Sequence, residues 1–157
     1  TFTNEIYMVG GTVRDFYLGL ESSDRDIIVM DEDARSFSLK LAELFDATFV
    51  PLDEENKIYR IVLPDKINYI DVTNPVGDSI ENDLMRRDLT INAIAVNLRT
   101  GELIDISGGV TDIKNKCINY VNELNFVDDP LRLLRVYRFQ ALYGFELAPE
   151  TINAVCR

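Results

Sequence analysis

The strongest constraint on the fold is a pair of β-forming runs in the middle of the chain that only three residues separate. The runs are residues 58–63 (IYRIVL) and 67–73 (INYIDVT), and Pro64-Asp65 lies at the turn between them. β-branched and aromatic residues are typical of strands, whereas proline and aspartate are typical of turns. Strands joined this closely pair as an antiparallel hairpin, so we predict a sheet in the middle of the chain.

Strand and helix patterns are mixed along the rest of the chain. Further β-forming runs lie at residues 6–9, 26–30, 47–50, 91–98 and 103–106, the last two as a strand pair. Helical spacing of apolar residues occurs at 12–18, at 34–45 and from 129 onward. We therefore predict an α+β fold in which helices flank a mixed, mainly antiparallel sheet.

Composition excludes several kinds of function. The 157-residue chain is 46% hydrophobic and 27% charged, the balance of one globular domain. It has no histidine, which excludes histidine triads, histidine metal sites and histidine general bases. No apolar run approaches the ~20 residues of a membrane helix, and no signal peptide is recognisable. Cys117 and Cys156 match no disulfide or metal motif, so we expect reduced thiols and a cytoplasmic protein.

Charge is distributed unevenly along the chain. The formal net charge of −11 by itself argues against a nucleic-acid-binding domain, which should present a basic face. Residues 21–33 hold six acids and one arginine, whereas residues 129–138 hold three arginines and one aspartate. This pattern indicates separate sites, an acidic one suited to cations and a basic one suited to phosphates.

A glycine pair follows the first strand run, in the motif Gly10-Gly11-x-x-Arg14-Asp15. Glycines let backbone N–H groups approach an anion closely, and the N-terminus of the following helix adds partial positive charge. Arg14, one turn into that helix, can hold a phosphate through two hydrogen bonds. The alternative is a tight turn between strand and helix, with Arg14 paired to a surface acid.

Three aspartates on predicted strands form a candidate metal site. Asp24 and Asp26 lie two positions apart, so their side chains share one face of the strand. Carboxylates held this close repel one another unless a cation lies between them, and oxygen ligands suit Mg²⁺. Asp71, on a later strand, completes a three-carboxylate, two-metal cage if the two strands are neighbours. The alternative is that these carboxylates are solvated.

Two arginines precede an apolar segment in the motif Arg86-Arg87-Asp88-Leu-Thr-Ile-Asn92. Paired arginines at the edge of a core fit phosphate recognition. Asp88 can orient one of the arginines, and Asn92 is free to hydrogen-bond a sugar or a phosphate. The alternative is a solvated basic turn.

Charged residues recur at every third position near the end of the chain: Asp129, Arg132, Arg135 and Arg138. On a helix they cover an arc of roughly 180°. An aspartate–arginine pair can also present donors and acceptors to a nucleobase edge. Apolar residues fall near one side of the same predicted helix, namely Leu131, Leu134, Tyr137, Phe139 and Leu142. The alternative is salt bridges between these arginines and the many acids of the chain.

The order of the motifs is more specific than any one of them. GGTVRDFYLG, DRDIIV, IDVT, RRDLTINAIA, LIDISGG and DDPLRLLRVYRF follow one another over about residues 6–145. In this order they resemble the family of class II tRNA nucleotidyltransferases (CCA-adding enzymes) and bacterial poly(A) polymerases. The resemblance implies a head domain of the DNA polymerase β nucleotidyltransferase type. It also implies transfer of a nucleotide from CTP or ATP to the 3′ end of tRNA, with two Mg²⁺ ions and release of pyrophosphate.

The resemblance implies a role for each motif. Asp24 and Asp26 match the metal-binding D-x-D, and Asp71 lies where the superfamily keeps a third catalytic carboxylate. Asp129 and Arg132 match the pair that reads the Watson–Crick edge of the incoming base. The residues implied to bind nucleotide are Gly10, Gly11, Arg14, Arg86, Arg87, Asp88, Asn92, Asp129, Arg132, Arg135 and Arg138.

The resemblance also implies a division of the chain. We expect a catalytic head over residues 1–122 and the beginning of a helical neck over residues 123–157, in a fragment of a longer protein. Later helical domains of the family hold most tRNA contacts, so the net charge of −11 does not contradict an RNA substrate. The sequence indicates no oligomeric state.

Alternative functions remain within the family and outside it. Residues 72–85 are a short segment where many CCA-adding members carry a longer loop with an R-x-E element. A CC-adding, A-adding or poly(A)-adding relative with the same head is therefore an alternative. Outside the family, the alternatives are a non-catalytic nucleotide-binding module and an acidic interaction domain.

Overall fold

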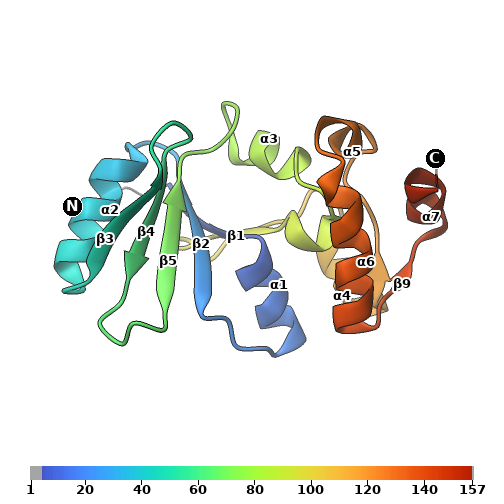
Figure 1. Ribbon diagram of the computed structural model, residues 1–157, viewed down its shortest axis with the longest axis horizontal. Coiled ribbons are helices and arrows are strands. Elements are labelled where there is room, and N and C mark those ends of the chain that lie inside the picture. The colour runs from blue at the N-terminus through green and yellow to red at the C-terminus, as the bar shows by residue number, and fades with distance from the viewer. Residues whose placement is uncertain (1–4, 157) are drawn as a thin grey trace.

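The computed structural model describes residues 5–156 and contains a seven-stranded sheet with helices packed against it (Figure 1). The strand order is β3-β4-β5-β2-β1-β6-β7, with β2 and β5 parallel and all other neighbours in this sheet antiparallel. The strands are β1 (Ile6–Val9), β2 (Asp24–Val29), β3 (Thr48–Asp53), β4 (Ile58–Val62), β5 (Tyr69–Thr73), β6 (Ala95–Asn97) and β7 (Leu103–Ile104). The predicted mixed, mainly antiparallel sheet is confirmed, and β4 and β5 form the predicted hairpin.

The helices lie in two groups at the ends of the molecule, with α1 (Gly11–Leu18) and α3 (Ile80–Met85) between the groups (Figure 1). Figure 1 shows α2 beside β3 and β4 at one end, and α4 to α7 at the other. The helices are α1 (Gly11–Leu18), α2 (Ala34–Leu44), α3 (Ile80–Met85), the 3-10 turn η1 (Thr90–Asn92), α4 (Gly109–Asn115), α5 (Leu124–Asp128), α6 (Leu131–Tyr143) and α7 (Pro149–Val155). Among the helices α4 to α7, the strands β8 (Cys117–Ile118) and β9 (Glu146–Leu147) form a short parallel pair.

Helix α2 covers one face of the sheet. Phe37 and Leu41 on α2 pack with Ile61 on β4 and Val72 on β5, and all four side chains are buried. The helix begins after Asp33, whose carboxylate accepts a hydrogen bond from the backbone N–H of Ser36 at 3.1 Å. Such an N-cap stabilises a helix by about 1 kcal/mol. Ile27 and Val29 of β2 and Ile70 and Val72 of β5 belong to this core, so Asp24, Asp26 and Asp71 face the opposite side of the sheet, because side chains alternate along a strand.

A second core joins α6 to the sheet-bearing part of the chain. Val136 and Phe139 of α6 are buried together with Val13 of α1 and with the segment that carries Leu89 and Ile91. All of these side chains are at most 3% exposed. Burial of one such side chain contributes roughly 1.5–3 kcal/mol. The hydrophobic effect therefore holds the arginine-bearing helix in a fixed position opposite β1 and β2.

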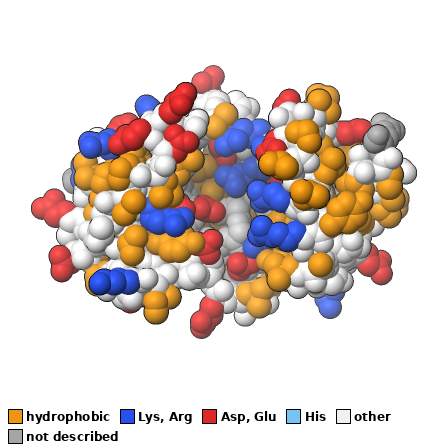
Figure 2. Space-filling view, in the orientation of Figure 1, with side chains coloured by type: hydrophobic (Ala, Val, Ile, Leu, Met, Phe, Trp, Pro, Cys, Tyr) orange, Lys and Arg blue, Asp and Glu red, His pale blue; other side chains and the backbone are white. Residues whose placement is uncertain are grey.

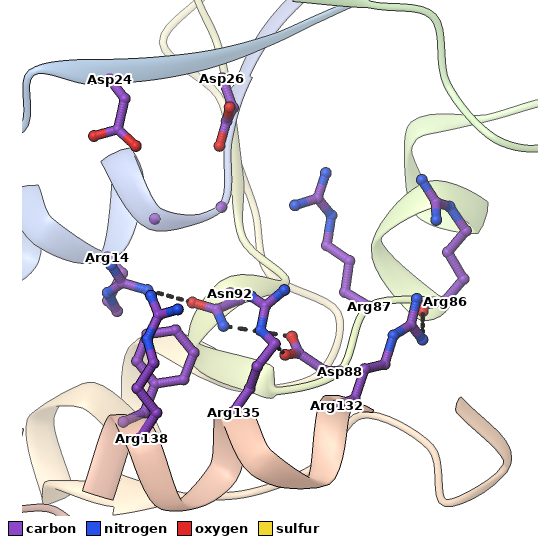
Figure 3. Close-up of a pocket in the computed structure, with 13 residues that line it drawn as sticks. Arg14, Asp24, Asp26, Arg86, Arg87, Asp88, Asn92, Arg132, Arg135 and Arg138 are labelled. Carbon is purple, nitrogen blue, oxygen red and sulfur yellow. Dashed lines mark hydrogen bonds and ion pairs between the residues drawn. The ribbon is translucent and has the colours of Figure 1, made fainter. Parts of the chain in front are cut away.

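The structure differs from the sequence predictions in three places. Residues 91–98 do not form one strand, because the 3-10 turn η1 precedes β6. Asp129 lies outside the helix, since α6 begins at Leu131 and Asp129 has an extended backbone. On α6 only Phe139 of the predicted apolar side is buried, whereas Leu131 and Leu134 are exposed. The helix instead turns its arginine side toward the sheet (Figure 3).

Two further predictions concern the thiols and membrane helices. Cys117 and Cys156 are both free thiols, as expected. Within residues 5–156, no helix combines the length and the hydropathy that crossing a membrane requires. The helical pattern predicted from residue 129 onward corresponds to α6 and α7, and Arg157 lies outside the described residues.

Candidate active site

A pocket of about 370 Å³ lies between the strand end of β1 and β2 and the helix α6. Figure 3 shows Asp24 and Asp26 on one side of it and the side chains of α6 on the other. Figure 2 shows lysine and arginine side chains gathered along the same hollow. The lining residues that the sequence predicted are Gly10, Gly11, Arg14, Asp24, Asp26, Arg86, Arg87, Asp88, Asn92, Arg132, Arg135 and Arg138. Of the predicted residues, Asp71 and Asp129 do not line the pocket, and Phe139 is an unpredicted addition.

The glycine pair forms the turn from β1 into α1. Gly10 has φ +68°, a left-handed conformation that favours glycine. A Cβ at this position would lie 3.0 Å from Nη1 of Arg87, so a side chain would also occupy the pocket. Gly10 therefore meets two requirements, the turn and the close approach of an arginine.

Arg14 is a buried arginine whose donors are largely satisfied. Its Nη1 donates to Oδ1 of Asn92 at 2.5 Å, and its Nη2 pairs with Asp15 at 2.8 Å. The guanidinium lies 5.0 Å from the ring centroid of Phe139 and 5.1 Å from that of Tyr143. The alternative interpretation, pairing with a nearby acid, is thus true of one edge of Arg14, while the residue still lines the pocket.

The D-x-D aspartates lie where two parallel strands meet. Asp26 on β2 is the register partner of Asp71 on β5, which confirms that these strands are neighbours. Burial raises the pKa of Asp26, the nearby Asp71 raises it further, and Arg87 partly opposes the shift. Asp26 is accessible to solvent from the pocket. On its other sides, protein atoms and the negative charge of Asp71 surround it. A set of carboxylate oxygens suits a hard divalent cation, so Asp24 and Asp26 fit such a metal.

The predicted three-carboxylate cage is not assembled. Both oxygens of Asp71 accept hydrogen bonds from Arg60, at 2.7 and 2.8 Å. The Arg60 guanidinium also lies 3.8 Å from the ring centroid of Tyr69. Among residues 5–156, no group of three or more acidic, cysteine or histidine residues is close enough to hold a metal. Asp71 is therefore beside the site, and each of its two oxygens accepts a hydrogen bond from an arginine.

Arg86 and Arg87 share a partner that the sequence analysis missed. Asp83 on α3, only 1% exposed, accepts from Nη2 of Arg86 at 3.1 Å and from Nη2 of Arg87 at 3.0 Å. The spacing of three and four residues on a short helix was the available signal. Asp88 was expected to orient an arginine, and it does so with Arg135 of α6, whose Nε lies 2.9 Å from Oδ2 of Asp88.

Hydrogen bonds of Arg132 connect the first turn of α6 to the ends of α3 and α5. Nη1 of Arg132 donates to the backbone carbonyls of Arg86 at 2.9 Å and Asn125 at 3.2 Å. Asp129 precedes the helix, accepts from the N–H of Leu131, and lies 3.6 Å from Nε of Arg132. The predicted aspartate–arginine pair is thus present as a loose ion pair whose aspartate is half exposed.

Six arginines converge on a pocket whose wall also holds two strand carboxylates. The arginines are Arg14, Arg86, Arg87, Arg132, Arg135 and Arg138. Planar guanidinium groups match phosphate oxygens through paired hydrogen bonds. A polyphosphate fits both parts of the pocket: the arginines bind its phosphate oxygens, and the strand carboxylates bind a divalent metal that the polyphosphate also contacts.

Comparison with known proteins agrees with this geometry. Residues 6–119 match the family described as the poly A polymerase head domain. A CC-adding tRNA nucleotidyltransferase of Synechocystis sp. is 41% identical over 146 residues, which cover 92% of this chain and 34% of that protein.

Solved structures agree in fold. A CCA-adding enzyme with ATP has a TM-score of 0.88 and 34% identity, covering 96% of this chain and 37% of that one. The Thermotoga maritima CCA-adding enzyme complexed with tRNA has a TM-score of 0.86 and 35% identity, covering 96% of this chain and 36% of that one. The chain thus spans little more than a third of the length of these relatives. Because residues 6–119 match the model of this family, the chain belongs to the family of class II CCA-adding enzymes and bacterial poly(A) polymerases.

Proposed function

We propose that the protein carrying this chain is a tRNA 3′-terminal CCA nucleotidyltransferase, which adds CMP and AMP from CTP and ATP. The observation that carries the proposal is the pocket in which Asp24 and Asp26 face six arginines. Relatives with this head are named CCA-adding or CC-adding enzymes, and one solved relative is bound to ATP and another to tRNA. The tRNA substrate would place the protein in the cytoplasm.

The reaction forms a bond between the 3′-oxygen of tRNA and the α-phosphorus of the nucleotide, and breaks the bond between the α-phosphorus and the bridging oxygen. Pyrophosphate leaves, and the hydroxyl proton passes to solvent. The family uses a divalent metal, which we propose is Mg²⁺ held by Asp24 and Asp26. When bound, such ions lower the pKa of the attacking hydroxyl and neutralise phosphate charge. The mechanism requires no histidine, in agreement with a chain that has none.

The arginines supply positive charge in addition to that of the metal. Arg87, whose Nη1 approaches Gly10, is placed to bind the triphosphate and to offset the charge that develops on pyrophosphate. Arg132 presents its remaining donors beside Asp129, as recognition of a base edge by protein side chains requires. Asp88 and Asn92 hold Arg135 and Arg14 in place around the same nucleotide.

We further propose that residues 1–122 form the catalytic head and that residues 123–157 begin the helical neck. The second core supports a close union of the two, because Phe126, Val136 and Phe139 are buried with residues of the head. Most contacts to tRNA would then lie in other parts of the protein. This division is consistent with a net charge of −11 for a chain whose protein acts on RNA.

A CC-adding enzyme is the second candidate. The connection between β5 and α3 comprises only residues 74–79, and the Synechocystis relative is named as CC-adding. The connection is also anchored: Asn74 donates to the carbonyls of Val29 and Glu32 at 2.9 and 2.8 Å. A short, anchored segment favours a head that stops after two cytidines.

Nucleotide incorporation by the full-length protein tests both candidates. The substrate is tRNA that ends at the discriminator base, with Mg²⁺ and with CTP and ATP offered separately and together, and the 3′ ends are sequenced. Addition of C-C-A supports the first candidate, and addition of C-C alone in the presence of both nucleotides supports the second. No addition by a folded protein contradicts both and favours a non-catalytic nucleotide-binding module.

A further inference from the structure

Asp83 is the most thoroughly buried carboxylate beside the pocket. Its side chain is 1% exposed, and a carboxylate so placed must be paired. Oδ2 accepts from both Nε and Nη2 of Arg87, at 3.2 and 3.0 Å. Oδ1 accepts from Nη2 of Arg86 at 3.1 Å and from the backbone N–H of Val76 at 3.0 Å. One carboxylate therefore holds both arginines of the motif and the connection between β5 and α3.

The contact fixes which edge of Arg87 faces the pocket. A guanidinium offers donors along two edges, and Asp83 takes the edge formed by Nε and Nη2. The remaining group, Nη1, lies 3.0 Å from where a Cβ of Gly10 would stand, and the same point is 3.8 Å from Oδ2 of Asp26. Figure 3 shows the Arg87 guanidinium between Asp26 and Arg86. Its free donors thus point at the space between the glycine turn and the D-x-D strand.

Without Asp83, Arg87 would have a different best partner. Oδ2 of Asp26 and Nη1 of Arg87 flank the same point beside Gly10, and the charge of Arg87 already acts on Asp26. An Arg87 released from Asp83 is expected to rotate toward Asp26 and to cover the oxygens that the metal requires. Asp83 therefore keeps the two charged groups apart before substrate arrives, which is electrostatic preorganisation.

We propose that Asp83 is a positioning residue for the triphosphate of the incoming nucleotide and acts through Arg87. The inference rests on the proposed function, because it assumes that a nucleoside triphosphate occupies the pocket. Asp83 itself lies behind the arginines and lines no part of the pocket. It recognises no base, so its effect is the same for CTP and ATP.

The test is a double-mutant cycle in the full-length protein with Asp83→Asn, Arg87→Ala and both together. Dissociation constants for CTP and ATP are measured by equilibrium titration, and KM and kcat by incorporation. Glu81→Gln is the matched control, because it removes one negative charge from an exposed position on the same helix. Unfolding temperatures are recorded for every variant.

The expected result is a ten- to hundredfold weaker binding of both nucleotides by Asp83→Asn, the scale of a lost hydrogen-bonded charge contact. KM should rise by a similar factor while kcat changes less, and Glu81→Gln should match the wild type. When Asp83→Asn is added to the Arg87→Ala variant, binding should weaken by less than about twofold more, because the two residues act as one unit.

Four outcomes would overturn the inference. Asp83→Asn could bind both nucleotides as tightly as the wild type does. Alternatively, the loss of nucleotide affinity in the double variant could equal the product of the losses in the two single variants. If Asp83→Asn does not fold, Asp83→Ser carries the test because it also removes the carboxylate, and wild-type affinity of a folded Asp83→Ser rejects the inference. A wild-type protein that binds nucleotides but adds none to tRNA rejects the proposed function alone, whereas one that binds no nucleotide rejects both.

Discussion

The guanidinium of Arg14 donates a 2.5 Å hydrogen bond to Oδ1 of Asn92, a residue 78 positions later in the chain. Both side chains are buried, at 8% and 4% exposure. Nδ2 of Asn92 also faces Oδ1 of Asp88 at 3.4 Å, and Asp88 pairs with Arg135 of α6. A polar chain thus runs from the helix after the glycine turn to α6 along one wall of the pocket.

The first prediction concerns this chain. Asn92→Ala leaves Nη1 of the buried Arg14 without its acceptor, so the free energy of unfolding should fall by about 1–3 kcal/mol. Urea denaturation measures the change. The control is Asn115→Ala, at an exposed position of α4, which should leave stability within about 0.5 kcal/mol of the wild type. Equal stability of the two variants would show that Arg14 has no need of Asn92.

The second prediction concerns the metal-binding role of the D-x-D aspartates. Asp24→Ala and Asp26→Ala in the full-length protein should each abolish nucleotide addition, because each removes carboxylate oxygens that hold the divalent ion. The fold should persist, since both side chains are accessible to solvent. Gel analysis of tRNA extension and circular dichroism provide the two readouts. Substantial activity in either variant would exclude that aspartate as a metal ligand.

The third prediction is a pH dependence that follows from Asp26. Burial, with Asp71 as the next cause, raises the pKa of Asp26 in the folded state above the unfolded value. The folded protein therefore binds more protons than the unfolded one between these two pKa values, and stability falls as pH rises through the folded pKa. In EDTA, Asp26→Asn should thus be more stable than the wild type at neutral pH.

The advantage of Asp26→Asn should disappear near pH 4, close to the ordinary aspartate pKa of about 3.9. Thermal unfolding of both proteins across this range measures the difference. An advantage that stays constant with pH would point to packing rather than to charge.

The site was predictable where its chemistry is local in the sequence. Asp24 and Asp26 share a face because side chains alternate along a strand, and spacing alone predicts this. The Gly10 turn was likewise predicted from a glycine pair after a strand run. The pairing of Asp71 with Arg60 was not predictable, because β4 supplies the arginine and its register relative to β5 is known only from the fold.

The segment after Arg87 shows why other contacts of the site could not be predicted from the sequence. Residues 89 to 95 are buried without alternation, so their apolarity does not distinguish a strand from a turn. Asn92 ends the turn η1 with its side chain turned to Arg14 and Asp88, a contact that requires α1 and η1 to be packed together. Helix α3, with six residues, is too short for a clear helical period, so the position of Asp83 was hidden.

The fourth prediction concerns the close packing of α4 on η1. A Cβ at Gly109 would lie 2.1 Å from the carbonyl oxygen of Thr90, which is backbone and cannot move aside. Gly109→Ala should therefore lower the free energy of unfolding by about 3 kcal/mol or more, at the upper end of overpacking effects. Gly101→Ala is the control, because no atom lies within 4 Å of its Cβ and only its positive φ costs about 1 kcal/mol. Similar losses for the two variants would contradict the packing argument.

The fifth prediction separates reading of the base from binding of the phosphates. Arg132 is fixed by two backbone carbonyls through Nη1, which leaves its other donors beside Asp129. Arg132→Ala should lower discrimination of CTP and ATP against GTP and UTP about ten- to hundredfold in kcat/KM, the scale of one lost bidentate base contact.

The other five arginines of the pocket remain in Arg132→Ala, so triphosphate binding should weaken less than base choice does. The measurement is kcat/KM of the full-length protein for each of the four nucleotides, together with inhibition by inorganic triphosphate. Leu134→Ala, exposed on the same helix and outside the pocket, should keep wild-type selectivity. A uniform loss of kcat/KM for all four nucleotides, with weaker triphosphate inhibition, would instead identify Arg132 as one more phosphate-binding arginine, because a phosphate contact carries no information about the base.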